Sequence, residues 1–337
     1  MRAVVVHGPG DVRVEERPDP SPGPGDVLVA MEWGGVCGSD ISYALHGASG
    51  TAVLRHPLVL GHEVAGRVAV LGEGVTSYAV GDAVTVHPAT PSDEPLPARL
   101  MGRTNLHREV RYLGSAAFDP HVDGGFSTYK VFRASQLRAL PSGVSTQLGA
   151  LAEPLAVALH AVGRLGPLDD REVLVNGAGS IGCLVVAAAK ARGAGRVVAA
   201  DVNAAALDQA RSLGADDVVD LGADQTLPSD VELVVEASGV PAALGAVLHA
   251  TSRGGTVVQV GNLPIVPTPA VLADLVTREI TWTGSYRFVD EITEAVELLA
   301  KGIDLSPLIA GTVDLDDAPA AIPAAGSTPG KVLLRLG

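Results

Sequence analysis

A glycine-rich turn between an apolar strand and an alanine-rich helix constrains the fold of this chain more than any other feature. The segment VLVN is followed by GAGSIG at residues 177–182, and the next predicted strand ends in Asp201, 19 residues beyond Gly182. Gly177 permits the tight turn, Gly179 lets the backbone approach a pyrophosphate, and Gly182 lets helix and strand pack closely. This arrangement predicts a dinucleotide site.

The residues around the turn also predict which dinucleotide is bound. The helix that begins with Ser180 and Ile181 presents unpaired N–H groups to the phosphates. Asp201 is placed to accept hydrogen bonds from ribose hydroxyls, and its carboxylate would repel a 2′-phosphate. The sequence therefore favours NAD over NADP. The alternative interpretation is a glycine-tightened turn beside a surface aspartate.

Strand-like and helix-like segments alternate from about residue 146 onward, which predicts an α/β fold with a doubly wound parallel sheet. The predicted strands are Glu172–Asn176, Arg196–Asp201, Asp217–Asp220, Val231–Glu236, Thr256–Val260 and Ile280–Ser285. The predicted helices are Leu148–Val162, Ser180–Arg192, Ala204–Leu213, Ala242–Thr251 and Glu291–Lys301.

The first third of the chain has a different pattern, with short strands separated by turns, and it predicts a small antiparallel barrel. Its strands are Met1–Val6, Val12–Glu16, Val27–Trp33, Glu63–Leu71, Ala83–Val86 and Ser127–Phe132. Near the C-terminus we expect a loop at Ala318–Ala325 and a last strand at Lys331–Leu336.

Composition and charge exclude several classes of function. Of 337 residues, 38 are acidic and 24 basic, and a formal charge of -14 disfavours nucleic acid and anionic membranes as partners. No apolar run approaches the roughly 18 residues that span a bilayer, and the N-terminus does not resemble a signal peptide. Only Cys37 and Cys183 are present, so a disulfide framework is excluded and a cytoplasmic location is expected.

Three short segments contain candidate metal ligands. They are Cys37 with Ser39 and Asp40, His62 with Glu63, and Glu153. Cysteine, histidine and glutamate all bind zinc, and three protein ligands with an open position are typical of a catalytic site. Taken singly, each has another explanation, since a lone cysteine is usually a core residue and Glu63 would serve to cap a turn.

Together these segments resemble the zinc-containing medium-chain alcohol and polyol dehydrogenases over nearly the whole chain. The resemblance rests on CGSD, on GHE, on AEPLAVALHA and on the glycine motif. Glu153 stands where alcohol dehydrogenases carry a second cysteine, which is typical of the polyol branch. The segments YLGSAAFDPHVDGGF (residues 112–126) and GSYRF (residues 284–288) are most similar to the L-idonate 5-dehydrogenases.

The resemblance implies a two-domain organisation and a reaction. A GroES-like barrel would comprise residues 1–145 and 290–337, and a Rossmann domain would comprise residues 146–289. The implied reaction is zinc-dependent oxidation of a secondary hydroxyl of a sugar acid or polyol, with hydride transfer to NAD. It also implies one catalytic zinc per chain and a homodimer or homotetramer, with Ile280–Ser285 pairing across subunits.

The same resemblance assigns roles to the metal-site residues. Cys37 and His62 would bind zinc with Glu63 as a third ligand, and Glu153 would lie beside the metal, bound directly or through water. Ser39 would contact the substrate oxygen, and Asp40 would orient the ligands.

Substrate and cofactor contacts are implied for a further set of residues. Tyr43, Phe118, Arg287 and Phe288 would line the substrate pocket, and Val260 and Arg287 would contact the cofactor. Packing in the core is an equal alternative for Tyr43 and Phe118. Arg287 suits a carboxylate or polyol hydroxyls, and the alternatives are a cofactor phosphate or Glu153.

The sequence departs from the family pattern at two places. Residues 92–107 contain no cysteine, so the structural zinc that many relatives carry is expected to be absent. Ser42 replaces a histidine that passes the proton to solvent in many relatives, which leaves the proton path open. Competing interpretations are a sorbitol- or xylitol-type dehydrogenase, a zinc-free quinone reductase, and a nucleotide-binding protein without catalysis.

Overall fold

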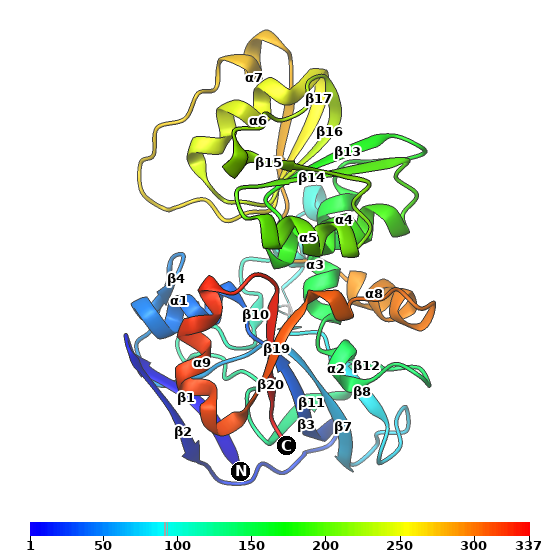
Figure 1. Cartoon of the computed structure of the whole chain (residues 1–337). Coiled ribbons are helices and arrows are strands. Elements are labelled where there is room, and N and C mark those ends of the chain that lie inside the picture. The colour runs from blue at the N-terminus through cyan, green and yellow to red at the C-terminus, as the bar shows by residue number, and fades with distance from the viewer. Residues whose placement is uncertain (91, 93) are drawn as a thin grey trace. The chain divides into compact units, whose positions relative to one another are not determined.

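The computed structural model describes residues 1–90, 92 and 94–337, which divide into two compact units (Figure 1). The first unit comprises Met1–Glu153, Ile292–Gly302 and Ile309–Gly337, and the second comprises Pro154–Glu291 and Ile303–Leu308.

The first unit is dominated by antiparallel strands that surround a core of valine, leucine and aromatic side chains. Seven of its described strands form one sheet in the order β12-β8-β7-β3-β20-β19, with β11 also paired to β3. In β3 the buried positions alternate, as expected for a strand with one face on a core. The strands are β1 (Arg2–Gly8), β2 (Asp11–Glu16), β3 (Asp26–Gly35), β4 (Ala48–Ser49), β5 (Ala52–Val53), β6 (Leu58–Val59), β7 (Glu63–Leu71), β8 (Ala83–Val86), β9 (Ala89–Thr90), β10 (Arg111–Tyr112), β11 (Tyr129–Arg133), β12 (Leu137–Ala139), β19 (Ile309–Asp314) and β20 (Lys331–Arg335).

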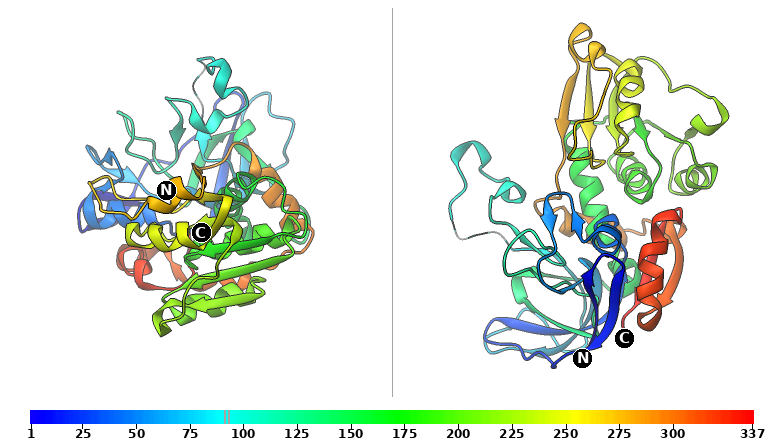
Figure 2. Two further views of the ribbon diagram at one scale, coloured as in Figure 1. Left: turned by 90° about the horizontal axis from the view of Figure 1, so that it is seen from above. Right: turned by 90° about the vertical axis from the view of Figure 1, so that its left-hand side faces the viewer.

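Helices of the first unit flank these strands, and both chain termini lie close together beside them (Figure 2). The helices are α1 (Gly38–His46), α2 (Thr146–Gly149), most of α8 (Glu291–Ala300) and α9 (Ala318–Ala324). Short 3₁₀ turns occur in both units: η1 (Ala98–Leu100), η2 (Thr104–Leu106), η3 (Ala134–Gln136), η4 (Leu221–Ala223), η5 (Pro241–Ala243), η6 (Ser306–Leu308), η7 (Leu315–Asp317) and η8 (Ala325–Ser327).

The described residues of the second unit form a six-stranded parallel sheet. Its strand order is β15-β14-β13-β16-β17-β18. The strands are β13 (Glu172–Asn176), β14 (Arg196–Asp201), β15 (Asp217–Asp220), β16 (Val231–Glu236), β17 (Thr251–Gln259) and β18 (Thr281–Gly284). The helices are α3 (Ala152–Gly163), α4 (Ser180–Ala191), α5 (Ala204–Ser212), α6 (Leu244–Ala250) and α7 (Ala273–Thr277).

Chain order reverses between β13 and β16, so right-handed crossovers place α4 and α5 on one face of the sheet and α6 on the other. The strands are buried on both faces and read as continuous runs of valine, leucine and alanine. The predicted α/β fold, with an antiparallel part and a doubly wound parallel sheet, is confirmed.

The prediction of one helix over Leu148–Val162 is wrong. The segment contains α2, which ends at Gly149, and α3, which begins at Ala152. Pro154 lies in the first turn of α3, where its missing N–H has no helical partner to lose. In a continuous helix the same proline would lie in the interior and clash with the carbonyl four residues earlier.

The expectation of a loop at Ala318–Ala325 is also wrong, because Ala318–Ala324 forms α9. Pro319 occupies its first turn, which tolerates proline. Ala318 and Ile322 are fully buried, and the helix packs against α1 and β2. Tertiary packing of this small apolar face outweighs the low helix propensity of the two prolines.

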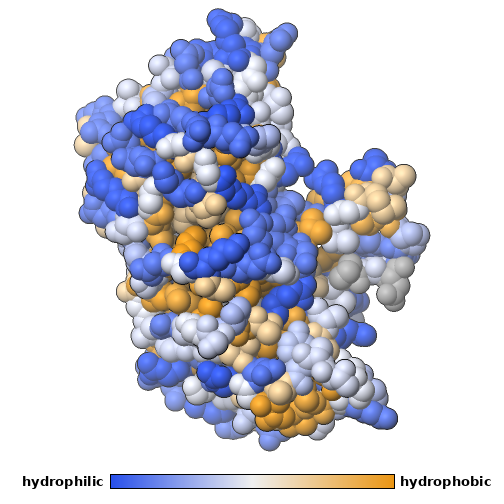
Figure 3. Space-filling model, turned by 90° about the vertical axis from the view of Figure 1, so that its right-hand side faces the viewer, coloured by the Kyte–Doolittle hydropathy of each residue, from blue (hydrophilic) through white to orange (hydrophobic). Residues whose placement is uncertain are grey.

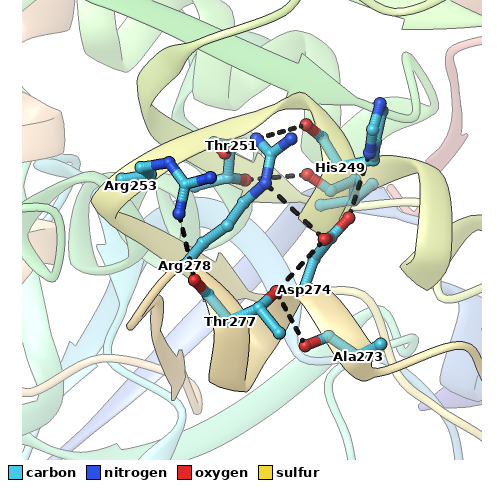
Figure 4. Close-up of polar contacts among 8 residues, drawn as sticks. His249, Thr251, Arg253, Ala273, Asp274, Thr277 and Arg278 are labelled. Carbon is cyan, nitrogen blue, oxygen red and sulfur yellow. Dashed lines mark hydrogen bonds and ion pairs between the residues drawn. The ribbon is translucent and has the colours of Figure 1, made fainter.

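Strand β17 begins at Thr251, earlier than its predicted start at Thr256, because Thr251 already pairs with Val231 before an irregularity in the register. Side-chain contacts also surround this segment (Figure 4). Arg278 donates to the carbonyl oxygens of His249 and Thr251, each at 2.9 Å. Arg253 donates to the carbonyl of Thr277, and Asp274 contacts both His249 and Arg278. These contacts join the start of β17 to α7.

No helix among the described residues is long and apolar enough to cross a membrane. On the face drawn in Figure 3, hydrophilic and hydrophobic residues are interspersed.

Candidate zinc and nucleotide sites

Cys37, His62 and Glu63 form a cluster in the first unit. One ligand atom from each, the Cys37 sulfur, an imidazole nitrogen and a carboxylate oxygen, lies within 4.8 Å of the other two. The pairing of β3 with β7 brings them together, because Gly35 at the end of β3 lies opposite Glu63 at the start of β7. Cys37 follows β3 by two residues and His62 immediately precedes β7, so both reach the same end of the sheet.

Asp40 holds the two ligand segments together. It is fully buried in the first turn of α1, and its Oδ2 accepts a hydrogen bond from the Cys37 N–H at 2.9 Å. Its Oδ1 accepts from the Gly61 N–H at 3.1 Å. Burial raises the pKa of Asp40, although His62 and these N–H donors lower it in part. The carboxylate therefore orients Cys37 through its own N–H and His62 through the N–H of the preceding Gly61.

Glu63 pairs with Lys331, which the sequence interpretation missed. The Lys331 ammonium donates to Glu63 Oε1 at 2.7 Å and to the Val36 carbonyl at 3.2 Å, and both charged side chains are buried. Burial lowers the pKa of Lys331, but Glu63, Cys37 and Glu153 together outweigh it and the net pKa is raised. The one available signal was a lysine at the head of the apolar strand KVLLR.

Glu153 lies in the first turn of α3, where the Tyr112 hydroxyl donates to its Oε1. The Tyr112 ring stands edge-on to the His62 ring, with centroids 5.7 Å apart. Burial is the main reason that the pKa of Glu153 is raised, and His62 opposes this shift. Tyr112, named in the sequence only as part of a longer similar segment, therefore links Glu153 to the Cys37–His62–Glu63 cluster.

The chemistry of these side chains fits a zinc ion. A thiol, an imidazole and a carboxylate converge, and Glu63 Oε2 is buried with no hydrogen-bond partner in the described part of the chain. Burial lowers the pKa of His62, yet Cys37, Asp40 and Glu153 together raise it to about 10. The groups around the imidazole therefore carry more negative than positive charge when they are ionised, and a bound divalent cation would neutralise part of that charge.

The other predicted residues of the first unit occupy different local environments. Ser39 is half-buried in the first turn of α1. The Ser42 hydroxyl donates to the Ala48 carbonyl at 2.6 Å. Tyr43 is a core residue, 2% exposed, whose hydroxyl accepts a hydrogen bond from the Ala116 N–H. Phe118 is half-buried, with the Arg111 guanidinium 5.4 Å from its ring centroid.

The lobe that carries a structural zinc in many relatives contains η1 and η2 here, and Asp93 within it lies outside the described residues. The His107 Nε2 donates to the Glu94 carbonyl at 2.8 Å, across the lobe.

In the second unit the three motif glycines occupy three different environments. Gly177 has φ +96°, which favours glycine. A Cβ on Gly182 would lie 1.8 Å from the Gly177 carbonyl oxygen, so helix and strand approach too closely for a side chain. A Cβ on Gly179 would meet nothing within 4 Å. Open space therefore lies above Gly179, where a phosphate would approach the N-terminus of α4.

Asp201 is positioned by the same turn. Its Oδ2 accepts from the Ala178 N–H at 2.6 Å, and its Oδ1 accepts from the Asn203 N–H at 2.9 Å. Ser180 and Ile181 are half-buried in the first turn of α4, and the Val260 N–H donates to the Glu236 carbonyl at 2.9 Å.

Arg287 and Phe288 follow β18. Arg287 has φ +52° and its guanidinium lies 4.8 Å from the Tyr286 ring centroid, while Phe288 is buried.

Comparisons with known proteins agree with this geometry. Residues 23–142 match the alcohol dehydrogenase GroES-like domain, and residues 180–301 match the zinc-binding dehydrogenase family. Sorbitol dehydrogenase of Gallus gallus is 38% identical over 94% of this chain and 90% of its own length.

Solved structures extend the similarity to the three-dimensional level. L-idonate 5-dehydrogenase of Escherichia coli is 34% identical with a TM-score of 0.93, covering 99% of this chain and 97% of its own. A zinc-binding dehydrogenase from Sinorhizobium meliloti, solved bound to NADP, is 32% identical with a TM-score of 0.89, covering 99% and 98%. The chain belongs to the zinc-dependent medium-chain alcohol and polyol dehydrogenases, oxidoreductases that act on CH–OH groups.

Proposed function

We propose that this enzyme oxidises a secondary hydroxyl of a sugar acid or polyol with NAD, and that L-idonate is its substrate. The convergence of Cys37, His62 and Glu63 within 4.8 Å carries the proposal, because a zinc-free reductase has no need of that set. The similarity to L-idonate 5-dehydrogenase supports the choice of substrate.

Cys37 and His62 would hold the zinc with Glu63, and Glu153 would lie beside it. When bound, the ion supplies Lewis-acid polarisation that lowers the pKa of a substrate hydroxyl. Ser39 accepts the proton of that hydroxyl and passes its own onward to water or to cofactor hydroxyls. Ser42 is a poor next step in this relay, since its hydroxyl already donates to the Ala48 carbonyl.

NAD would bind at the turn of residues 177–182, with its pyrophosphate over Gly179, and its nicotinamide ring would accept the hydride. Asp201 favours NAD, because its carboxylate is held beside this turn and no cation follows it in Val202-Asn203-Ala204. Because the Sinorhizobium meliloti relative was solved bound to NADP, the preference for NAD should be tested with both cofactors. A kcat/KM for NADP above that for NAD would contradict the proposed preference.

Arg287 is assigned to the carboxylate of a sugar acid, which a planar guanidinium binds well. A neutral polyol such as sorbitol is the second candidate, because the sorbitol dehydrogenases are up to 38% identical. The initial rate of NAD reduction with L-idonate and with D-sorbitol decides between them. A faster rate with sorbitol keeps the zinc and NAD chemistry but removes this role from Arg287.

Cys37→Ala and His62→Ala should each abolish turnover and leave NAD binding within about twofold, because the glycine turn belongs to the other unit. Retained turnover in both variants, or a protein without bound zinc at full activity, would revive the quinone-reductase interpretation.

We also infer a cytoplasmic homodimer or homotetramer. Light scattering on the purified protein tests the oligomeric state.

A further inference from the structure

Glu236, the last residue of β16, carries a buried carboxylate surrounded by hydrogen-bond donors. It is 0% exposed. Its Oε1 accepts from Asn176 Nδ2 at 3.3 Å, from the Ser238 N–H at 2.8 Å and from the Ser238 hydroxyl. Its Oε2 accepts from the Gly239 N–H at 3.2 Å and from Gln259 Nε2. A buried charge persists only when it is satisfied in this way.

The position of this carboxylate in the sheet points to the nucleotide site. Glu236 lies opposite Asn176, the last residue of β13, and next to Gln259, the last residue of β17. Strand order reverses between β13 and β16. Ligands of doubly wound sheets bind outside the carboxyl ends of the strands at this reversal. The Glu236 carboxylate therefore joins three strand ends at the place where the cofactor approaches.

The loop of residues 237–239, which the carboxylate binds, is in direct contact with the glycine turn. A Cβ on Gly177 would lie 2.5 Å from the Ser238 nitrogen and 2.7 Å from its Cα. On its other side, a Cβ on Gly261 would lie 2.3 Å from the Gly239 nitrogen. The backbone of this loop thus forms the support against which the turn at Gly177 rests, and a small shift of the loop moves the turn.

We propose that Glu236 is a positioning residue for the cofactor. Its carboxylate holds residues 237–239 against Gly177 and so sets the affinity for the nicotinamide dinucleotide without touching it. This inference rests on the NAD-linked function proposed above.

A glutamine cannot replace the carboxylate, because its amide accepts hydrogen bonds only through the oxygen. In Glu236→Gln the new NH₂ group would face Gln259. The Gln259 amide can rotate to present Oε1, which is buried without a partner in the described structure, and its Nε2 then no longer donates to the Gly261 carbonyl. The Gly239 N–H has no such freedom. The variant therefore keeps the contact between β16 and β17 and the Ser238 bonds to Oε1, and it loses the bond from the Gly239 N–H that helps to hold the loop.

The test is a fluorescence titration of zinc-loaded wild type and Glu236→Gln with NADH. We expect about tenfold weaker NADH binding in the variant, the factor that corresponds to about 1.4 kcal/mol, close to the lower end of the range for one hydrogen bond to a charged group. The KM for NAD should rise by a similar factor, while kcat at saturating NAD and the zinc content stay within about twofold.

Two further variants separate positioning from simple stability. In Glu236→Gln/Gln259→Glu the carboxylate and the amide exchange places, which restores the charged contact between the strands but leaves the Gly239 N–H unpaired. Its thermal stability should recover while its NADH affinity stays low. Ser238→Ala removes the hydroxyl contact to Oε1 and the bond that this hydroxyl accepts from the Val240 N–H, but it leaves both loop N–H bonds to the carboxylate. Its NADH affinity should remain within about twofold of wild type.

Unchanged NADH affinity in Glu236→Gln would overturn the inference. So would an affinity that recovers together with stability in the exchanged variant, since Glu236 would then act on the fold alone. A wild-type protein that binds no NADH would instead contradict the proposed function and this inference with it.

Discussion

The ammonium of Lys331 lies 2.7 Å from Oε1 of Glu63 in the interior of the first unit, although 268 residues separate the two in sequence. The side chains are 4% and 1% exposed. Their contact occupies one carboxylate oxygen and leaves Oε2 free of other partners in the described structure. Lys331 therefore holds the Glu63 carboxylate, a proposed zinc ligand, through Oε1 and leaves Oε2 available to the metal.

Lys331→Met should strongly destabilise the zinc-free protein, because it leaves the Glu63 carboxylate buried without its partner. The expected loss is about 3–5 kcal/mol in the free energy of unfolding, measured by urea denaturation. Combining it with Glu63→Gln removes the stranded charge and should recover most of the loss. A double variant no more stable than Lys331→Met would show that the ion pair does not account for the effect.

Asp40→Asn should weaken zinc binding with little change in the fold. One amide oxygen cannot accept from both the Cys37 and the Gly61 N–H groups, so one ligand segment loses its anchor. Loss of such an orienting partner typically costs about 10–100-fold in metal affinity. Competition with a chromogenic chelator measures the affinity, and circular dichroism checks the fold. Wild-type affinity in the variant would remove Asp40 from this role.

The two cysteines should differ sharply toward a thiol reagent. Burial raises the pKa of Cys183 to about 12, so its thiol stays protonated and unreactive in the native protein. Cys37 is only half-buried. In the native zinc-free protein a disulfide reagent should modify Cys37 alone, and added zinc should protect it. Modification that persists in Cys37→Ser would contradict this assignment.

Gly179→Ala and Gly182→Ala form a matched pair. A methyl group on Gly182 would collide with the Gly177 carbonyl, so that variant should lose stability or fail to fold. A methyl group on Gly179 meets open space, so that variant should keep its melting temperature within a few degrees. It should nevertheless bind NADH more weakly, because the methyl occupies the approach to the helix N-terminus. Wild-type NADH affinity in Gly179→Ala would place the pyrophosphate elsewhere.

Acid should weaken the second unit through Glu291, whose Oε1 lies 2.7 Å from His160 Nδ1. Burial raises the pKa of Glu291, but the hydrogen bonds from His160 and from the Val289 N–H outweigh it, and the net pKa is lowered. A lowered folded-state pKa means stabilisation that is complete above the unfolded-state value of about 4.3. The stabilisation disappears as the pH falls through the folded-state pKa.

The measurement is the free energy of unfolding of wild type and Glu291→Gln from about pH 6 downward. The wild type should be more stable at the upper end, and the difference should vanish in acid. Acid also lowers stability through the titratable groups of the metal site, but wild type and Glu291→Gln share these groups. The difference between their free energies of unfolding at each pH therefore excludes that contribution. A difference that is independent of pH would contradict the linkage.

Much of this protein follows from local sequence. The glycine turn, the alternation of strands and helices, and the aspartate at the end of the second strand are short-range patterns. They predict the doubly wound sheet and the bounds of β13, β14, β15 and β16, but not the early start of β17. The β-rich segments between turns in the first third of the chain likewise predict β7 and β8 at their observed bounds. Cys37, His62 and Glu63 were identified as ligand types from their neighbours in sequence.

Other features arise only when distant segments pack together. Hydrophobic patterning does not show that Lys331 meets Glu63, that Tyr112 donates to Glu153, or that Glu236 joins three strand ends. The helix at Ala318–Ala324 has poor local propensity and exists because α1 and β2 cover its apolar face. The sequence alone determined which residues are apolar and which carry ligand chemistry, since these are properties of single residues and near neighbours. Only the tertiary structure decided which buried charges face one another, because burial and strand register set the distance between groups far apart in the chain.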